Sequence, residues 1–166
     1  MNILPQGFEI VIIGTGPVGY TAALGLAQTG YRVALIGPHD PPSRNGRTVA
    51  VLDGSVQLLS ELDIWQKVRS NAAPLSFMRM IDDTGSLFRA PPVTFKSAEL
   101  NLEAFGYNIE LTDLVKKLSE AAEQTPNLFL FDTTLAAIDY QESKSAGRGG
   151  YRLNLGTGET ILANIV

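Results

Sequence analysis

The sequence predicts an α/β fold built around a parallel sheet, and three features near its start support this. The apolar run at residues 10–13 does not alternate with polar residues, which is typical of a strand buried on both faces. A glycine-rich turn at residues 14–19 follows directly, and residues 20–29 then have the pattern of a helix. A second apolar run at residues 33–36 completes a strand–turn–helix–strand unit of about 30 residues.

The turn has the spacing Gly-x-Gly-x-x-Gly, and each glycine has a physical role in a dinucleotide site. Gly14 permits the tight exit from the strand, Gly16 leaves room for a diphosphate, and Gly19 lets the helix lie close to the sheet. Backbone amides and the positive end of the helix dipole would face the phosphates. We therefore expect a dinucleotide to be bound by Gly14, Thr15, Gly16, Pro17, Val18 and Gly19.

Small residues continue along the predicted helix at Ala23 and Ala27, so one face can approach the sheet closely over three turns. Pro17 suits the first turn, because a proline there loses no helical hydrogen bond. The alternative is a tight strand–helix turn in an α/β protein that binds no dinucleotide. The two strands and the stripe of small residues together favour the dinucleotide.

The end of the second strand lacks the acidic residue that usually binds the ribose of the adenosine. Gly37 occupies that position, and we expect it to lie at the cofactor. Asp40, backbone groups or water could hold the ribose instead. We expect the substitution Gly37→Glu to tighten this contact.

The composition is that of one domain with a hydrophobic core: 166 residues, 45% of them hydrophobic. The net charge of −4 argues against a nucleic-acid partner. The absence of cysteine excludes a disulfide, a thiol nucleophile and a zinc–cysteine site, and we expect no metal site. The single histidine, His39, is expected to be exposed in a proline-rich loop. Residues 1–6 show no signal-peptide pattern and no apolar run could span a bilayer, so we expect a cytoplasmic protein.

The rest of the chain alternates helical and strand patterns. We expect a helix at residues 55–65 that is capped by Ser55, and an amphipathic helix around residues 114–122. Strand patterns predict a hairpin at 78–81 and 87–89, a buried parallel strand at 128–131, antiparallel strands at 135–140 and 151–155, and a strand from 161.

This order of elements resembles the flavoprotein aromatic-ring monooxygenases built like p-hydroxybenzoate hydroxylase, and most closely their ubiquinone-biosynthesis branch. The resemblance covers essentially the whole chain. Its most specific segments contain Arg47 and Trp65. The residues that carry it are 14–19, 46–51, 58–65, 73–75 and 106–110.

The resemblance implies a Rossmann-like FAD/NAD(P)-binding fold, a three-layer ββα sandwich with a central parallel sheet and a β-meander. Residues 1–166 would be the N-terminal part of the FAD-binding domain, with residues 74–105 as the first piece, a hairpin, of an inserted substrate domain. The family's second flavin motif, Gly-Asp-Gly, would follow Val166. We therefore expect the N-terminal portion of a longer hydroxylase, which alone binds FAD weakly and is inactive.

The resemblance also implies FAD as cofactor and NAD(P)H as co-substrate. Arg47, with Thr48, matches the position that the family places beside the cofactor; the alternative is a solvated loop arginine. The backbone of Leu135 would lie by the adenine; the alternative is an ordinary core leucine. NAD(P)H would reduce the flavin, and dioxygen would then hydroxylate an electron-rich phenol. The cofactor supplies this chemistry, so we assign no catalytic acid, base or nucleophile.

The expected substrate is a small aromatic molecule, and a prenylated one would bring the protein to a membrane surface as a peripheral contact. The oligomeric state stays open. Two other functions remain: a stand-alone dinucleotide-binding module without catalysis, and part of another FAD- and NAD-dependent oxidoreductase.

Overall fold

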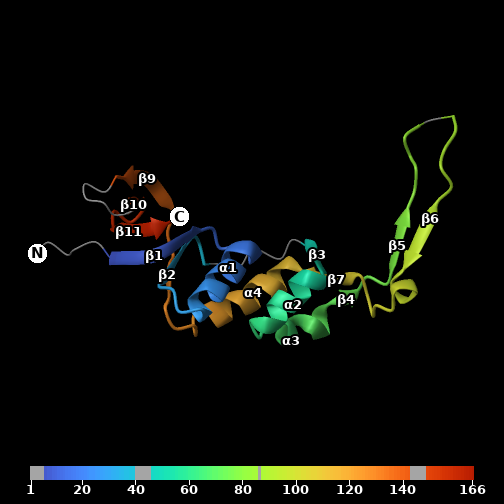
Figure 1. Cartoon of the computed structure of the whole chain (residues 1–166), viewed down its shortest axis with the longest axis horizontal. Coiled ribbons are helices and arrows are strands. Elements are labelled where there is room, and N and C mark those ends of the chain that lie inside the picture. Colours follow the sequence, from blue (N-terminus) through green and yellow to red (C-terminus); the bar gives the residue numbers. More distant parts are fainter. Residues whose placement is uncertain (1–5, 40–45, 86, 143–148) are drawn as a thin grey trace, which may run out of the picture. The chain divides into compact units, whose positions relative to one another are not determined.

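The computed structural model describes residues 6–39, 46–85, 87–142 and 149–166 (Figure 1). The chain forms two units, one made of residues 1–43 and 114–166 and the other of residues 44–113. The first unit is therefore discontinuous in sequence. It carries the predicted glycine-rich turn.

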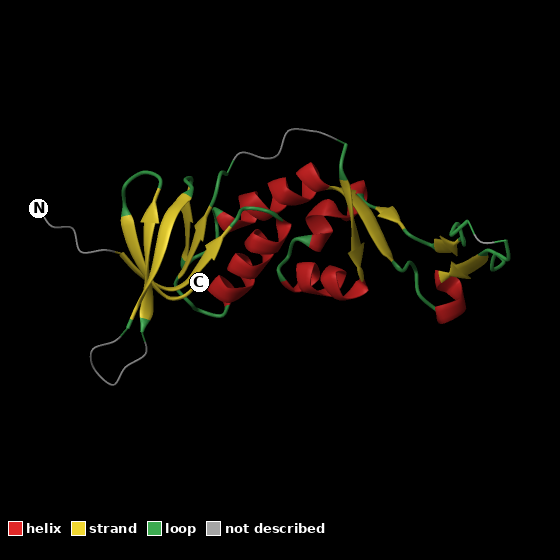
Figure 2. Ribbon diagram, turned by 90° about the horizontal axis from the view of Figure 1, so that it is seen from above, coloured by secondary structure: helices red, strands yellow, loops and turns green. Residues whose placement is uncertain are grey.

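The first unit is built on one six-stranded, twisted sheet (Figure 2). Its strand order is β8-β2-β1-β11-β10-β9. The first four of these strands are parallel, and β10 runs antiparallel to both of its neighbours. The expected parallel strand and the antiparallel pair are therefore confirmed. The strands are β1 (Gln6–Ile13), β2 (Val33–Ile36), β8 (Leu128–Phe131), β9 (Leu135–Gln141), β10 (Gly150–Leu155) and β11 (Thr160–Ile165).

Two helices belong with this sheet, α1 (Pro17–Gln28) and α4 (Leu111–Ala122), and they lie side by side (Figure 1). The hydroxyl groups of Tyr20 and Ser119 join them at 3.3 Å. Ala23 and Ala27 are buried, as the stripe of small residues predicts, and α1 packs on β1, β2 and β8. The buried residues of α4 fall on one face, at the spacing of an amphipathic helix: Leu114, Val115, Leu118 and Ala122.

A separate cluster of buried side chains joins the parallel and the antiparallel parts of the sheet. Phe131, Leu135 and Tyr151 pack against it. Its members are Phe8, Val11, Ala34, Ile36, Leu153, Leu155, Ile161 and Ala163. This core fixes the relative positions of the strand ends from which the nucleotide site is built.

The second unit contains a small antiparallel sheet with the order β3-β7-β4. Its strands are β3 (Thr48–Leu52), β7 (Gly106–Glu110) and β4 (Ala73–Pro74), and short helical turns lie at η1 (Arg69–Asn71) and η2 (Ser97–Leu100). The ring of Trp65 packs on that of Tyr107, with centroids 4.9 Å apart.

The helix expected at residues 55–65 is in fact two helices, α2 (Asp53–Glu61) and α3 (Trp65–Val68). Asp63 separates them with a positive φ of 55°, which a continuous helix does not allow. Ser55 is not the cap, because β3 leads directly into α2 and Leu52 is the N-terminal flanking residue. The carboxylate of Asp53 lies in the first turn, where it suits the helix dipole.

The expected hairpin is present with a different second strand. β5 (Phe77–Met80) pairs with β6 (Val93–Lys96), and residues 87–89 form no strand. Residues 91 and 92 are prolines, which lack the amide that a ladder needs, so the second strand begins after them. Among the described strands, β5 and β6 pair only with each other.

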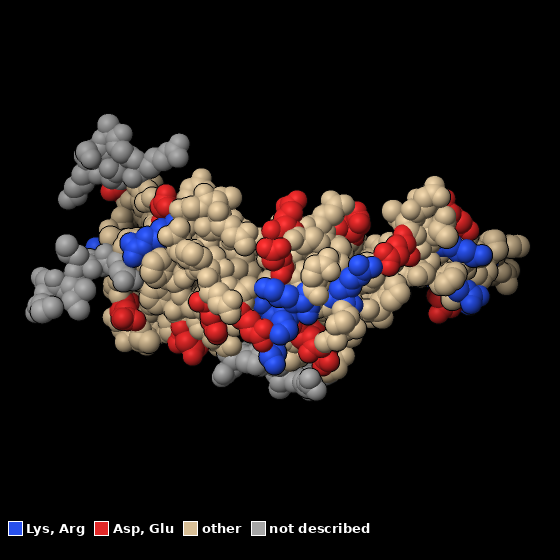
Figure 3. Space-filling model, turned by 90° about the horizontal axis from the view of Figure 1, so that it is seen from below, with Lys and Arg blue, Asp and Glu red and all other residues tan. Residues whose placement is uncertain are grey.

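On the face shown in Figure 3, basic and acidic side chains are interspersed. The Arg69–Glu103 pair at 3.2 Å is exposed and contributes little to stability, and the Lys117–Glu120 pair at 2.7 Å is half-buried. None of the helices in the described ranges is both long enough and apolar enough to cross a membrane.

Candidate nucleotide-binding site

The glycine-rich turn begins where β1 ends. Gly14 has a φ of +114°, which favours glycine, and its amide donates a hydrogen bond to the carbonyl of Ile36 at 2.7 Å. This bond fixes the end of β1 to the end of β2. Helix α1 starts three residues later with Pro17 in its first turn, as predicted.

Gly19 is required by the close approach of α1 to the turn. A Cβ atom at this position would overlap the carbonyl oxygen of Gly14. Any side chain here would therefore push the helix away from the strand end. The role that the sequence predicts for this glycine in packing is confirmed.

Gly16 differs from Gly19, because neither its backbone nor its packing requires glycine. Its φ and ψ of −81° and 177° are open to any residue, and a Cβ atom would meet nothing within 4 Å. The space above Gly16 is open, and a diphosphate approaching there would be excluded by a side chain. The fold therefore does not explain why this position lacks a side chain.

Within the described residues, no side chain caps the start of α1 and no acidic residue in its first turn offsets the helix dipole. The amides of Val18 and Gly19 lie in the first turn, where a helix offers no acceptor. This corner, with open amides and the positive dipole end, fits a diphosphate group such as that of FAD.

Gly37 lies against this corner and is buried. A Cβ atom at Gly37 would lie 2.8 Å from Oγ1 of Thr15, and that hydroxyl donates a hydrogen bond to the carbonyl of Pro38 at 2.6 Å. The structure thus brings the predicted residues 14–19 and 37 together. It argues against the expectation that Gly37→Glu tightens a ribose contact, since the new side chain would first displace Thr15.

His39 is not the exposed histidine that we expected. It is half-buried, and its ring atom Nε2 is shielded from solvent without a hydrogen-bond partner. Its backbone amide donates a hydrogen bond to Oδ1 of Asp132 at 3.2 Å. We did not predict Asp132 from the sequence, although its place directly after the strand at 128–131 was a usable signal. Asp40, named as a candidate for the ribose, lies outside the described residues.

The other predicted cofactor contacts are not tested by this geometry. Arg47 and Thr48 belong to the second unit: the carbonyl of Arg47 accepts a hydrogen bond from the amide of Leu111 at 2.9 Å, and Thr48 begins β3. Leu135 begins β9, and its side chain packs against the hydrophobic cluster of the first unit. All three remain predictions.

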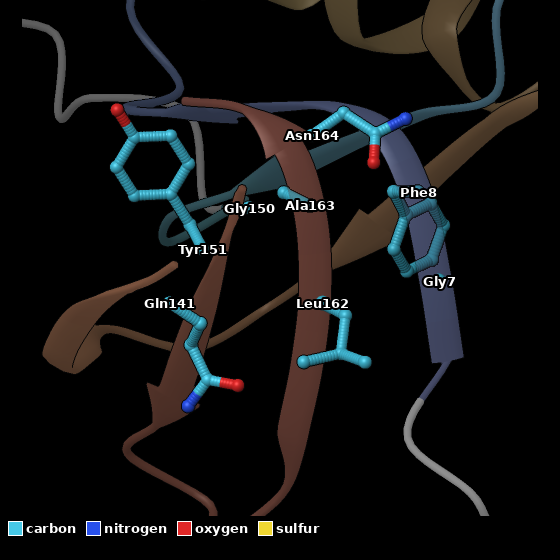
Figure 4. A pocket seen from close by; sticks show the side chains of 8 residues that line it. All are labelled: Gly7, Phe8, Gln141, Gly150, Tyr151, Leu162, Ala163 and Asn164. Carbon is cyan, nitrogen blue, oxygen red and sulfur yellow. The ribbon is translucent and has the colours of Figure 1, made fainter. Parts of the chain in front are cut away.

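A pocket of about 330 Å³ lies at the opposite end of β1 from the glycine turn, because Gly7 and Phe8 at the start of this strand line it (Figure 4). The rest of its lining comes from β9, β10 and β11, including the side chains of Gln141, Tyr151 and Asn164. The pocket is therefore separate from the nucleotide corner. Within the described ranges, no three side chains are grouped so that they could hold a metal ion.

Comparison with known proteins identifies the family. Residues 8–164 match the family model for the FAD binding domain. The chain is 31% identical to 3-demethoxyubiquinol 3-hydroxylase of Escherichia coli, over 97% of this chain and 40% of that protein. It is 25% identical to the ubiquinone hydroxylase UbiL of Rhodospirillum rubrum, over 95% of this chain and 36% of that protein. The chain thus spans about two fifths of the length of these relatives.

Solved structures share the fold. The flavin-dependent monooxygenase PieE, whose structure is a complex with FAD and substrate, matches with a TM-score of 0.72 and 18% identity over 98% of this chain and 30% of that one. The p-nitrophenol 4-monooxygenase PnpA of Pseudomonas putida matches with a TM-score of 0.69 and 17% identity over 96% of this chain and 40% of that one. With the family model matching nearly every residue, the chain belongs to the FAD-binding domain family.

Proposed function

We propose that this protein is the FAD-binding portion of a flavoprotein monooxygenase that hydroxylates an aromatic ring, in a phenolic precursor of ubiquinone, with NAD(P)H and O2. The observation that carries the proposal is the match along 97% of the chain to a relative named as a ubiquinol hydroxylase. The open corner above Gly16 supports it, since the fold itself does not explain that glycine.

The residues of the corner would hold the diphosphate of FAD. The amides at the start of α1 would donate hydrogen bonds to its oxygens, and the helix dipole would favour its negative charge. Thr15 would keep the ends of β1 and β2 together through its bond to Pro38. The bound flavin supplies the electron-transfer and oxygen chemistry, and the chain supplies binding and orientation.

Arg47, Thr48 and the backbone of Leu135 are proposed as further contacts to FAD. Residues 74–105 are proposed as the first piece of the substrate domain. The β5–β6 hairpin within this segment supports that proposal, because it pairs with no other strand and exposes apolar side chains such as Phe77 and Met80. Such exposed apolar surface marks an interaction site.

The substrate class is proposed from the names of the relatives: a small aromatic molecule, with a prenyl chain in the case of a ubiquinone precursor. A prenylated substrate would require contact with a membrane surface. The cytoplasmic location stays a prediction from the sequence.

The experiment is a titration of the purified chain with FAD, NAD and ADP, followed by flavin fluorescence and by calorimetry. We expect FAD and ADP to bind competitively and NAD to bind more weakly. Absence of FAD binding would contradict the proposal. Equal binding of FAD and NAD, without flavin reduction by NAD(P)H in a longer form of the protein, would instead identify a nucleotide-binding module without catalysis.

Arg47→Ala tests the contact proposed for the second unit. We expect FAD affinity to fall by about tenfold, the effect of losing one charge-assisted hydrogen bond, with a smaller change in thermal stability. Arg152→Ala, which removes an exposed arginine from β10, is the matched control. If the free energy of unfolding falls by as much as the free energy of FAD binding, Arg47 has a structural role.

A further inference from the structure

Among the described residues that follow β2, none places a carboxylate where the strand ends. Gly37 occupies that position, and an acidic side chain there would first have to displace the side chain of Thr15. A ribose at this edge would therefore lack its usual partner on β2. A carboxylate for the ribose would then come from Asp40, which lies outside the described residues, or from a neighbouring strand.

Asp132 places a carboxylate at this edge from the neighbouring strand. β2 and β8 are parallel, Ile36 is paired with Phe131, and the amide of Gly37 donates to the carbonyl of Phe131 at 3.1 Å. Asp132, directly after β8, thus corresponds to Gly37, directly after β2. The carboxyl ends of parallel strands meet at one edge, so this side chain lies on the side of the sheet to which the glycine turn belongs.

The carboxylate of Asp132 is held over the segment that leaves β2. Its Oδ1 accepts the hydrogen bond from the amide of His39, two residues after Gly37. Its second oxygen, Oδ2, receives no hydrogen bond within the part of the chain that the structure describes, and the side chain is exposed. One oxygen therefore fixes the orientation while the other stays available to a ligand.

A second residue at this edge has a buried polar atom without a hydrogen-bond partner. Nε2 of His39 is buried and has no partner in the described residues. Buried polar atoms without a partner are uncommon and often belong to sites that a ligand completes. His39, whose backbone amide orients Asp132, thus also has a side-chain nitrogen without a hydrogen-bond partner.

We propose that Asp132, at the end of β8, binds the adenosine ribose hydroxyls of FAD in place of an acidic residue at the end of β2. The proposal rests on the proposed function, because it assumes that the diphosphate lies at Gly16. A carboxylate accepts hydrogen bonds from both hydroxyls of a ribose, and such charge-assisted bonds are short and strong. Gly37 in turn allows Thr15 to occupy the space that a side chain on β2 would need.

The experiment compares ADP with 2′,3′-dideoxy-ADP, by calorimetry, on the wild-type chain, Asp132→Asn and Asp132→Ala. The Asn variant keeps an oxygen for the amide of His39 but loses the charged acceptor. We expect wild type to bind ADP about tenfold more tightly than the dideoxy analogue. Both variants should lose this preference, and their affinity for the dideoxy analogue should equal that of wild type.

Asp139→Asn, which removes an exposed carboxylate from β9, is the matched control and should keep the full preference for ADP. A preference that persists in Asp132→Asn and Asp132→Ala would overturn the proposal and leave the proposed function intact. An equal loss for both nucleotides would also overturn it, by assigning Asp132 a structural role only. If wild type bound neither FAD nor ADP, the proposed function would fall together with this inference.

Discussion

At the scale of single residues, the three glycines of the turn differ in why a side chain is absent at each position. Gly14 provides a positive φ, Gly19 provides close packing, and Gly16 is required by neither. The distinction separates the two glycines that the fold requires from Gly16, above which the space is open. It also makes the two kinds of glycine separable by experiment.

Gly16→Val should block FAD while leaving the fold intact. The backbone angles suit valine and the space is open, so we expect the free energy of unfolding to change by less than about 1 kcal/mol. FAD affinity should fall by at least about tenfold, because the side chain occupies the place of the diphosphate. Thermal unfolding and fluorescence titration measure both effects. Gly25→Ala, an open glycine further along α1, is the control and should bind FAD normally.

Gly19→Ala, unlike Gly16→Val, should lower the stability of the fold. Its Cβ atom overlaps the carbonyl oxygen of Gly14, so the turn and α1 must move apart. We expect a loss of about 1–3 kcal/mol in the free energy of unfolding, as for overpacked cores. Chemical denaturation measures this loss. A variant as stable as wild type would show that the close approach is absent in solution.

At the scale of elements, most boundaries follow from the chemistry of the residues at their ends. α1 starts at a proline, α2 ends before the left-handed Asp63, and β6 starts after two prolines. The loop between β5 and β6 is organised by Asp82. Its carboxylate accepts hydrogen bonds from the amide of Ala90 at 3.0 Å and from the amide and the hydroxyl of Thr84 at 3.1 and 2.7 Å.

These donors lower the pKa of Asp82 below its usual value near 3.8, with the amide of Ala90 as the largest cause and Thr84 next. Because the pKa is lower when the loop is formed, the carboxylate stabilises the loop fully above pH 3.8. This contribution is lost as the pH falls through the lowered pKa. NMR shifts of the amide protons of Thr84 and Ala90 should therefore change only below pH 3.8. In Asp82→Asn the change should be absent; if it persists, another group orders the loop.

The sequence predicts the parts of the fold that local pattern controls. The buried parallel strands, the glycine turn and the amphipathic α4 were all expected, because each has a period or a spacing that only one element satisfies. The sheet of β3, β7 and β4 was not, since pairing between strands more than thirty residues apart leaves no local signal. The place of Asp132 after the strand at 128–131 could be seen in the sequence, but its alignment with Gly37 could not, because it depends on which strand pairs with β8.

At the scale of the whole molecule, the first unit is completed by residues from both ends of the chain. β1 has β2 on one side and β11 on the other, so the turn after β1 depends on strands that are far apart in sequence. In the sequence, residues 44–113, which form the second unit, come between these two parts. The family match at residues 8–164 includes both units.

Removal of the β5–β6 hairpin tests how independent it is. The amide of Ser97 donates to the carbonyl of Ser76 at 3.0 Å, so a short glycine-rich turn can replace residues 77–96. We expect the shortened chain to fold and to bind FAD with unchanged affinity, since β5 and β6 pair only with each other. Fluorescence titration checks this. A folded but FAD-free product would assign the hairpin to the nucleotide site.

The most direct test of the account is an NMR titration that follows individual backbone amides as ADP, FAD or adenosine is added. We predict that ADP and FAD shift the amides of Thr15, Gly16, Val18 and Gly19, and that adenosine, which lacks phosphate, does not. If these amides stayed in place while those of the pocket at the start of β1, such as Phe8 and Tyr151, responded, the diphosphate would bind elsewhere and the account would be wrong.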